Sequence, residues 1–180
     1  MHSSCLVALP ENAPLREEEL GKFLWKHLNA YWSELEVEPY KTYFSQEQTV
    51  SLANRRGFPG VEALAQHLKE SETEGVENGQ YYWIITLNKN GRWDYFSIQK
   101  IATLKELKEL FPELSPYSVV DKDGRWYSEQ DYGYIPKLDY LQSQAHPDNV
   151  EPERQWNLFL QEFFKKHEEN SVFVLLDVHS

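Results

Sequence analysis

Apolar residues recur at helical spacing in two long segments of the chain. The first follows Pro14 and opens with three consecutive glutamates, residues 17–19, which suit the positive end of a helix dipole. The second begins at Pro152. We predict that each segment is a helix with one buried face. The apolar positions are Leu20, Phe23, Leu24, Leu28, Tyr31, Trp32 and Leu35 in the first segment, and Trp156, Phe159, Leu160, Phe163 and Phe164 in the second.

Two capping boxes predict shorter helices. Ser45 precedes Gln48 by three residues, and Thr103 precedes Glu106 by the same interval. In each pair the two side chains can satisfy backbone N–H groups that have no partner at a helix start. A further short helix is expected over 61–69, where apolar residues again share one face.

Runs of β-branched and aromatic residues predict strands, and Asn-Gly or Asp-Gly pairs predict the turns between them. One hairpin is expected around Asn88–Gly91 and another around Asp121–Gly124. The polar stretch 71–79 is predicted to be an exposed loop. The predicted strands cover 5–9, 37–44, 81–87, 92–98, 117–120, 125–128 and 172–178, and the first and last are the expected centre of the sheet.

This order of strands and helices favours the α+β class. The pattern predicts a mostly antiparallel sheet with helices packed on one face, ferredoxin-like in its first half. A length of 180 residues suits one α+β domain over 1–180.

The charge balance narrows the class of partner. Lys and Arg number 18 against 29 Asp and Glu, which gives a net charge of −11. Nucleic-acid binding depends on cations that neutralise phosphates, so no nucleic-acid partner is expected. Aromatic residues are numerous: 6 Trp, 11 Tyr and 9 Phe make up 14% of the chain. An exposed surplus of aromatic side chains is typical of a recognition surface.

Cysteine content and the first residues indicate a compartment. Cys5 is the only cysteine, which excludes an intrachain disulfide and fits a reducing environment. The apolar run at residues 5–9 is too short for a signal-peptide core, and no stretch is long enough for a membrane span. We therefore expect a cytoplasmic protein without a membrane partner.

A Gly-Arg-Trp element occurs twice, with Arg92 and Trp93 in the first copy and Arg125 and Trp126 in the second. One interpretation is convergent turn chemistry, since glycine is expected in tight turns. The other is that the guanidinium groups and indoles bind an anionic or planar ligand. Both interpretations remain open at this stage.

Asp177 and His179 end the final predicted strand, two residues apart and therefore on the same face. The pair could hold a metal, Asp177 could orient the imidazole of His179 as a general base, or the two residues could be a polar strand end of no special function. No familiar metal, nucleophile or phosphate-loop motif occurs, so neither a cofactor nor a metal is expected.

The long irregular stretch 129–151 is rich in tyrosine and includes Tyr132 and Tyr134. Loops of this length within a domain are usually functional or disordered. The tyrosines form either an exposed recognition cluster or a cover for the apolar face of the sheet.

Several segments resemble, in the same order, a family of uncharacterised bacterial and phage proteins. The matching segments are Leu35–Tyr40, Gly91–Tyr95, Asp123–Trp126 and Asp177–His179. Val178 stands where that family tends to have cysteine. The resemblance implies a phage or mobile-element context and a single α+β domain.

The leading functional hypothesis is a non-enzymatic binding or interaction protein, whose partner is a protein or a small anionic or planar ligand. The alternative is a small hydrolase or ligand-sequestering protein. Its pocket would combine Arg92, Arg125, Tyr134, Asp177 and His179. RNA binding ranks third because the net charge has the wrong sign.

Overall fold

The computed structural model describes residues 2–133 and 150–179, which form two compact units. The main unit comprises residues 1–33 and 90–180, and the inserted unit comprises residues 34–89. The single domain predicted over 1–180 stays a prediction.

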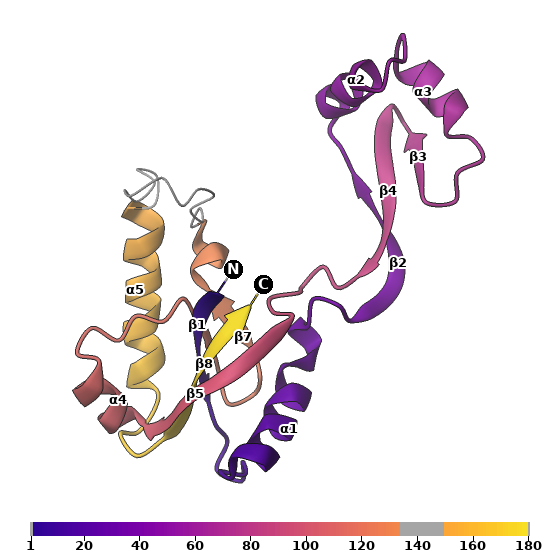
Figure 1. Cartoon of the computed structure of the whole chain (residues 1–180). Coiled ribbons are helices and arrows are strands. Elements are labelled where there is room, and N and C mark those ends of the chain that lie inside the picture. Colours follow the sequence, from indigo (N-terminus) through magenta and orange to yellow (C-terminus); the bar gives the residue numbers. More distant parts are fainter. Residues whose placement is uncertain (1, 134–149, 180) are drawn as a thin grey trace. The chain divides into compact units, whose positions relative to one another are not determined.

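The main unit contains a five-stranded sheet in the order β5-β8-β1-β6-β7 (Figure 1). β1 lies in the middle, antiparallel to β8 and parallel to β6, so the mostly antiparallel α+β class is confirmed. The central position of the two terminal strands is also confirmed. The elements are β1 (His2–Ala8), α1 (Glu17–Leu28), η1 (Asn29–Tyr31), β5 (Tyr95–Thr103), α4 (Leu104–Leu110), β6 (Ser118–Val120), β7 (Trp126–Ser128), η2 (Glu129–Tyr132), α5 (Val150–Lys165) and β8 (Val172–His179).

Helices cover both faces of this sheet, where the sequence predicted one covered face. Cys5 and Val7 of β1 pack in a core cluster with α1, whereas Leu6 and Ala8 pack in a second cluster with α4 and α5. β1 and β8 are apolar at consecutive positions, so side chains on both faces must be removed from water. The ferredoxin-like start stays a prediction.

The inserted unit is a three-stranded antiparallel sheet with two short helices. The strand order is β2-β4-β3, and β3 lies in the segment predicted to be a loop. A small core of Ala53, Leu64, Leu68 and Tyr81 joins the helices to one face of the sheet. The elements are β2 (Glu36–Tyr43), α2 (Gln46–Arg55), α3 (Val61–His67), β3 (Glu74–Glu77) and β4 (Gln80–Leu87).

The hairpin predicted around Asn88–Gly91 is wrong, because the strands on either side of it, β4 and β5, belong to different sheets. The turn before β4 instead uses Asn78 and Gly79, with φ angles of 51° and 76°. These positive values suit the tight primed turns that favour Asn-Gly. The hairpin around Asp121–Gly124 is confirmed, and it joins β6 to β7.

Local signals for helix starts are confirmed. Ser45 with Gln48 and Thr103 with Glu106 form complete capping boxes at α2 and α4.

Cys5 is a free, buried cysteine, and burial raises the pKa of its thiol to about 12. Within residues 2–133 and 150–179, no helix has the length and apolar character needed to cross a membrane.

Candidate functional site

The two tryptophans predicted to face a ligand are core residues instead. Trp93 is fully buried, and its indole Nε1 donates a hydrogen bond of 3.0 Å to the carbonyl oxygen of Leu28. Trp126 is 8% exposed and lies in the same cluster as α1. Apolar burial of these large rings stabilises the sheet, so neither indole offers a face to a ligand.

The predicted arginines do not converge on Asp177 and His179. Arg92 donates to Asp131 Oδ1 at 2.7 Å, and the other carboxylate oxygen of Asp131 accepts the backbone N–H of Ser128. Arg125 is exposed. Among the described residues, no hydrogen bond or ion pair joins either arginine to Asp177 or His179. The predicted common pocket is therefore not supported by direct contacts.

The described part of the tyrosine-rich stretch covers the core. Tyr132 packs on α5, with its ring centroid 5.8 Å from those of Trp156 and Phe159. Tyr127 is likewise half-buried against Phe159. Tyr134 lies outside the described residues. Of the two interpretations of these tyrosines, the structure supports a cover over the apolar face for Tyr127 and Tyr132.

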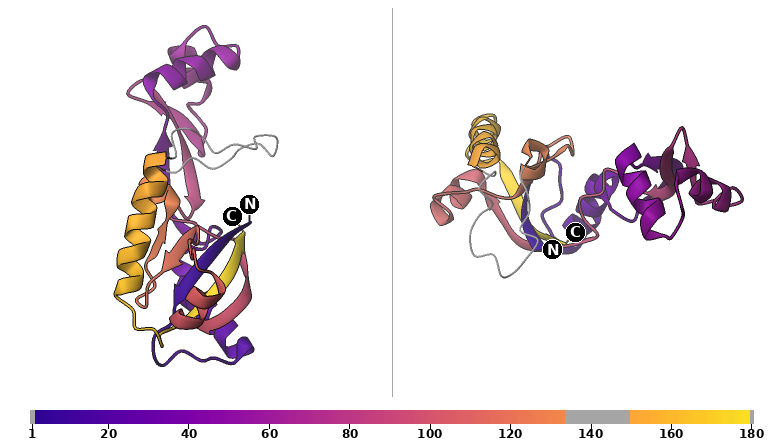
Figure 2. Two further views of the ribbon diagram at one scale, coloured as in Figure 1. Left: turned by 90° about the vertical axis from the view of Figure 1, so that its left-hand side faces the viewer. Right: turned by 90° about the horizontal axis from the view of Figure 1, so that it is seen from above.

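Asp177 and His179 do belong to a polar cluster. It lies at the end of the main sheet where β1 begins and β8 ends, close to both chain ends (Figure 2). In the strand register His179 lies between His2 on β1 and Tyr95 on β5. We call this group the terminal cluster. It consists of His2, Asp94, Tyr95, Asp177 and His179.

Each histidine of the terminal cluster has its own carboxylate. His2 Nδ1 lies 3.0 Å from Asp177 Oδ2, and His179 Nδ1 lies 2.9 Å from both carboxylate oxygens of Asp94. A carboxylate accepts hydrogen bonds, so each pair favours the tautomer that carries the proton on Nδ1 and a lone pair on Nε2. Both imidazoles are thereby oriented as proton acceptors.

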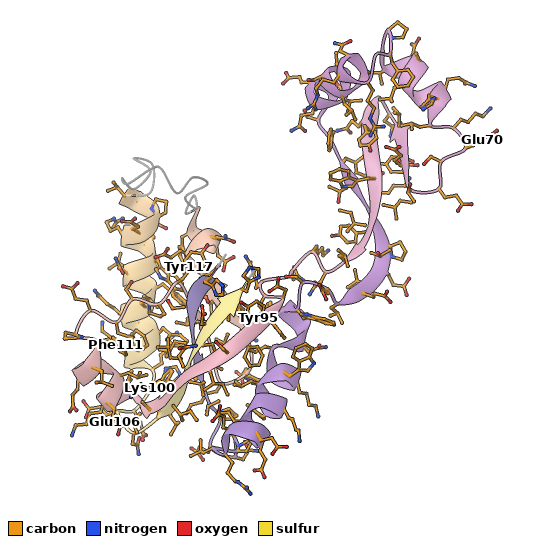
Figure 3. All side chains as sticks on the ribbon, viewed as in Figure 1. Glu70, Tyr95, Lys100, Glu106, Phe111 and Tyr117 are labelled. Carbon is orange, nitrogen blue, oxygen red and sulfur yellow. The ribbon has the colours of Figure 1, made fainter. Side chains whose placement is uncertain are left out.

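Tyr95, at the start of β5 (Figure 3), contacts both histidines of the cluster. Its hydroxyl lies 3.3 Å from His2 Nε2, and its ring stacks on His179 at a centroid distance of 5.1 Å and an angle of 18°. The His179 hydrogen bond, followed by that from the Tyr95 backbone N–H, lowers the pKa of Asp94 despite partial desolvation. Asp94 therefore remains ionised and continues to orient His179.

A shallow cavity of about 300 Å³ adjoins the terminal cluster. Asp177 and His2 line it together with hydroxyls, an amide and two leucines, and its lining contains no lysine or arginine. Among the described residues no group of three or more metal-ligating side chains could hold a metal ion. The arrangement is therefore suited to acid–base chemistry on an uncharged molecule rather than to anion or metal binding. The lining residues are His2, Ser3, Ser4, Gln99, Leu175, Leu176 and Asp177.

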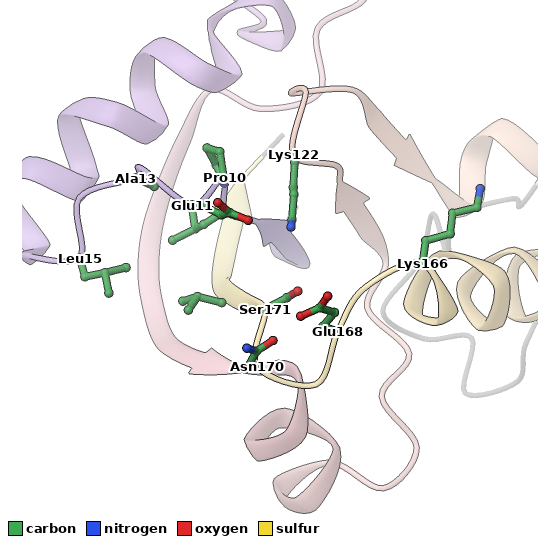
Figure 4. Close-up of a pocket in the computed structure, with 11 residues that line it drawn as sticks. Pro10, Glu11, Ala13, Leu15, Lys122, Lys166, Glu168, Asn170 and Ser171 are labelled. Carbon is green, nitrogen blue, oxygen red and sulfur yellow. The ribbon is translucent and has the colours of Figure 1, made fainter.

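A second cavity, of about 440 Å³, lies near the other end of the same sheet (Figure 4). Lys122 extends into it beside Glu11, whereas Lys166 points away. Two glutamates, Glu11 and Glu168, match the two lysines of the lining. Because the charges balance, this cavity has no excess positive charge with which to hold an anionic ligand.

The inserted unit contributes a different kind of surface. Side chains alternate along β4, so Tyr81 faces the helices whereas Tyr82 and Ile84 face the opposite side. The register places Tyr43 of β2 beside Tyr82 and Lys41 beside Ile84. We call the group on this side the open aromatic face. It consists of Lys41, Tyr43, Glu77, Tyr82 and Ile84.

The open aromatic face is held together by contacts along its surface. The Tyr43 hydroxyl donates to Glu77, and Lys41 Nζ lies 3.3 Å from the same carboxylate and 4.2 Å from the centroid of the Tyr82 ring. The Tyr43 hydrogen bond, followed by that from Lys41, lowers the pKa of Glu77. Tyr43 is 44% exposed and Ile84 is 36% exposed. Ordered aromatic area therefore remains in contact with water.

The open aromatic face was not predicted from the sequence, which pointed to the Gly-Arg-Trp elements and the stretch 129–151. His2, Asp94 and Tyr95 were not predicted either. Asp94 and His179 are 85 residues apart and meet only through the pairing of β5 with β8. A usable signal for the open aromatic face was present. Strand 80–87 has large side chains at consecutive positions, yet only two short helices lie nearby in the sequence to cover it.

Comparison of the chain with protein-family models, curated proteins and solved structures finds no match.

Proposed function

We propose that this protein is a binding protein whose open aromatic face holds a basic, partly apolar segment of a partner protein. The observation that carries the proposal is that helices cover only one face of the inserted sheet while the other presents Tyr43, Tyr82 and Ile84. Tyrosine is enriched at interfaces because it gives large contact area for a small loss of conformational entropy.

Charge supports the choice of a basic partner. Residues 34–89 contain nine glutamates and five lysines or arginines, and the whole chain has a net charge of −11. Such a field attracts cationic segments and repels nucleic acid, and attraction of this kind weakens with salt. The resemblance noted from the sequence favours a phage or mobile-element setting for this interaction. Buried, free Cys5 favours a cytoplasmic one.

Binding of defined peptides tests the proposal. The probes are peptides that combine Leu and Trp with Lys or Arg, compared with peptides in which Glu replaces the basic residues. We expect the basic set alone to bind, more weakly as salt rises. Ile84→Asp should reduce affinity at least tenfold, because a charge within the contact must be desolvated.

Val50→Asp is the matched control. Val50 is 49% exposed on α2, in the same unit but outside the open aromatic face, so this substitution adds the same charge without touching the face. Equal losses for both variants, or binding by neither peptide set, would refute the proposal. Self-association that Ile84→Asp abolishes would replace the partner protein by a second copy of the chain.

A further inference from the structure

Three side chains of the terminal cluster, Tyr95, His2 and Asp177, lie in a row at hydrogen-bond distances. Tyr95 Oη lies 3.3 Å from His2 Nε2, and His2 Nδ1 lies 3.0 Å from Asp177. A nucleophile within reach of a base that a third group orients is the arrangement that activates weak nucleophiles, and the first distance is often longer when no substrate is bound. His179 stacks on the Tyr95 ring, and Asp94 fixes His179 in turn.

We propose that Tyr95 is a nucleophile toward uncharged carboxylic esters, with His2 as its general base. Asp177 orients His2, and His179 positions the ring of Tyr95. This activity lies on the main unit, goes beyond the proposed binding role and does not depend on it.

The proposed reaction has two steps. Tyr95 Oη attacks the carbonyl carbon and its proton passes to His2 Nε2. The bond to the leaving oxygen then breaks, and that oxygen takes the proton from His2, which gives an alcohol and O-acyl-Tyr95. In the second step water attacks the acyl group with His2 as base. The acid is released, and His2 returns the proton to Tyr95.

Charge selects the substrate class. The cluster contains two carboxylates, the adjoining cavity is lined by no lysine or arginine, and the chain as a whole is acidic. A phosphate ester would be repelled, whereas a neutral ester has no charge to repel. Leu175 of the adjoining cavity suits a short acyl chain, and Ser4 and Gln99 supply polar contacts.

Tyr43 provides an internal control within the same molecule. Tyr43 and Tyr95 have similar exposure, 44% and 49%. The hydroxyl of Tyr43 donates to Glu77, a carboxylate, which raises the pKa of the phenol because ionisation would place two negative charges together. The hydroxyl of Tyr95 meets an imidazole, which can accept its proton without that repulsion.

The experiment measures acetylation of each tyrosine by para-nitrophenyl acetate, using peptide mass spectrometry on the untagged chain, with para-nitrophenyl phosphate as the anionic comparison. General-base assistance typically contributes about 100-fold or more. We expect Tyr95 to react at least about tenfold faster than Tyr43. The phosphate ester should not react.

Variants assign the roles. Tyr95→Phe keeps the ring and should abolish acylation there. His2→Gln and Asp177→Asn should reduce the Tyr95 rate toward that of Tyr43. His67→Gln should leave the Tyr95 rate unchanged, because His67 is exposed on the inserted unit and lies outside the terminal cluster.

Two results would overturn the proposal: equal rates at Tyr95 and Tyr43, or a Tyr95 rate insensitive to both His2→Gln and Asp177→Asn. Continued release of para-nitrophenol beyond one equivalent supports both steps. Release that stops at one equivalent overturns the second step and retains Tyr95 as an acyl acceptor. Loss of peptide binding by the open aromatic face alters none of these outcomes.

Discussion

The two sheets of this protein differ in how their faces are covered. The five-stranded sheet of the main unit has a core cluster on each face, so its largest rings, Trp93 and Trp156, are fully buried. The three-stranded sheet of the inserted unit has one core cluster, and Tyr43, Trp83 and Ile84 remain exposed. The inserted sheet therefore has one face without a core cluster, on which Tyr43 and Ile84 stay exposed.

This difference separates the two candidate sites as well. The terminal cluster is polar, and the pairing of β8 with β1 and β5 holds its histidines and carboxylates in register. The open aromatic face combines exposed rings with the Lys41–Glu77 ion pair. Sites that require exact proton geometry benefit from rigid support, whereas a docking surface requires mainly exposed area.

The largest expected loss of stability comes from a substitution in the core of the main unit. Trp93→Ala should lower the free energy of unfolding by about 3–5 kcal/mol, because it creates a cavity and leaves the Leu28 carbonyl without its indole donor. Ile84→Ala should cost less than about 1 kcal/mol, because its side chain is already in contact with water.

Urea unfolding, followed by hydrogen exchange resolved for each unit, measures both losses. A comparable loss for Ile84→Ala would show that the open aromatic face is part of a core.

Two glycines, one in a hairpin of each unit, allow the effect of an alanine substitution to be compared between the units. Gly124 and Gly79 both have positive φ, 82° and 76°, so alanine at either position should cost about 1–2 kcal/mol. A Cβ at Gly124 would also lie 3.2 Å from the backbone oxygen of His27, whereas a Cβ at Gly79 meets nothing within 4 Å.

Gly124→Ala should therefore destabilise more than Gly79→Ala by about 1 kcal/mol. Thermal unfolding of the two variants checks the order, and equal losses would contradict the close packing of the β6–β7 turn on α1.

The dependence of folding stability on pH has opposite signs in the two units. Burial, with a contribution from Glu153, raises the pKa of Glu129 in the main unit from 4.5 to about 7. The folded state then holds this proton more tightly, so stability falls as pH rises from 4.5 through 7. The change is at most about 2 kcal/mol, since water screens a half-buried carboxyl.

In the inserted unit, the Tyr81 hydrogen bond and then the Arg56 ion pair lower the pKa of Glu74 despite some burial. This contribution to stability is present above pH 4.5 and is lost as pH falls through the lowered folded-state pKa. Glu129→Gln should flatten the first trend and Glu74→Gln the second, in urea unfolding at a series of pH values. The same slope in both units would contradict these assignments.

Local chemistry was readable from the sequence. The capping boxes at Ser45 and Thr103, the α1 and α5 faces and the Asp121–Gly124 hairpin all depend on residues a few positions apart, so their physics is contained in a short segment. The i, i+2 spacing of Asp177 and His179 likewise placed both on one face, where His2 contacts each of them.

Pairing partners were not readable in this way. Asn78-Gly79 and Asn90-Gly91 have the same turn signal, yet only the first joins two strands of one sheet. Which strands pair depends on which strands bury their side chains together. The burial free energy and the loop-closure entropy that decide this pairing involve segments far apart in the sequence. For the same reason the sequence left two interpretations of the Gly-Arg-Trp elements open, and the burial of both tryptophans decides against indoles that face a ligand.

The sequence by itself determined the α+β class, the helix starts, the central place of the terminal strands and the acidic net charge. Tertiary structure alone decided that His2 lies within hydrogen-bond reach of both Tyr95 and Asp177, and that one face of the inserted sheet has no core cluster. Secondary structure follows from neighbours along the chain. Exposure and side-chain convergence depend on which surfaces pack against each other, and that is decided by the free energy of the whole fold.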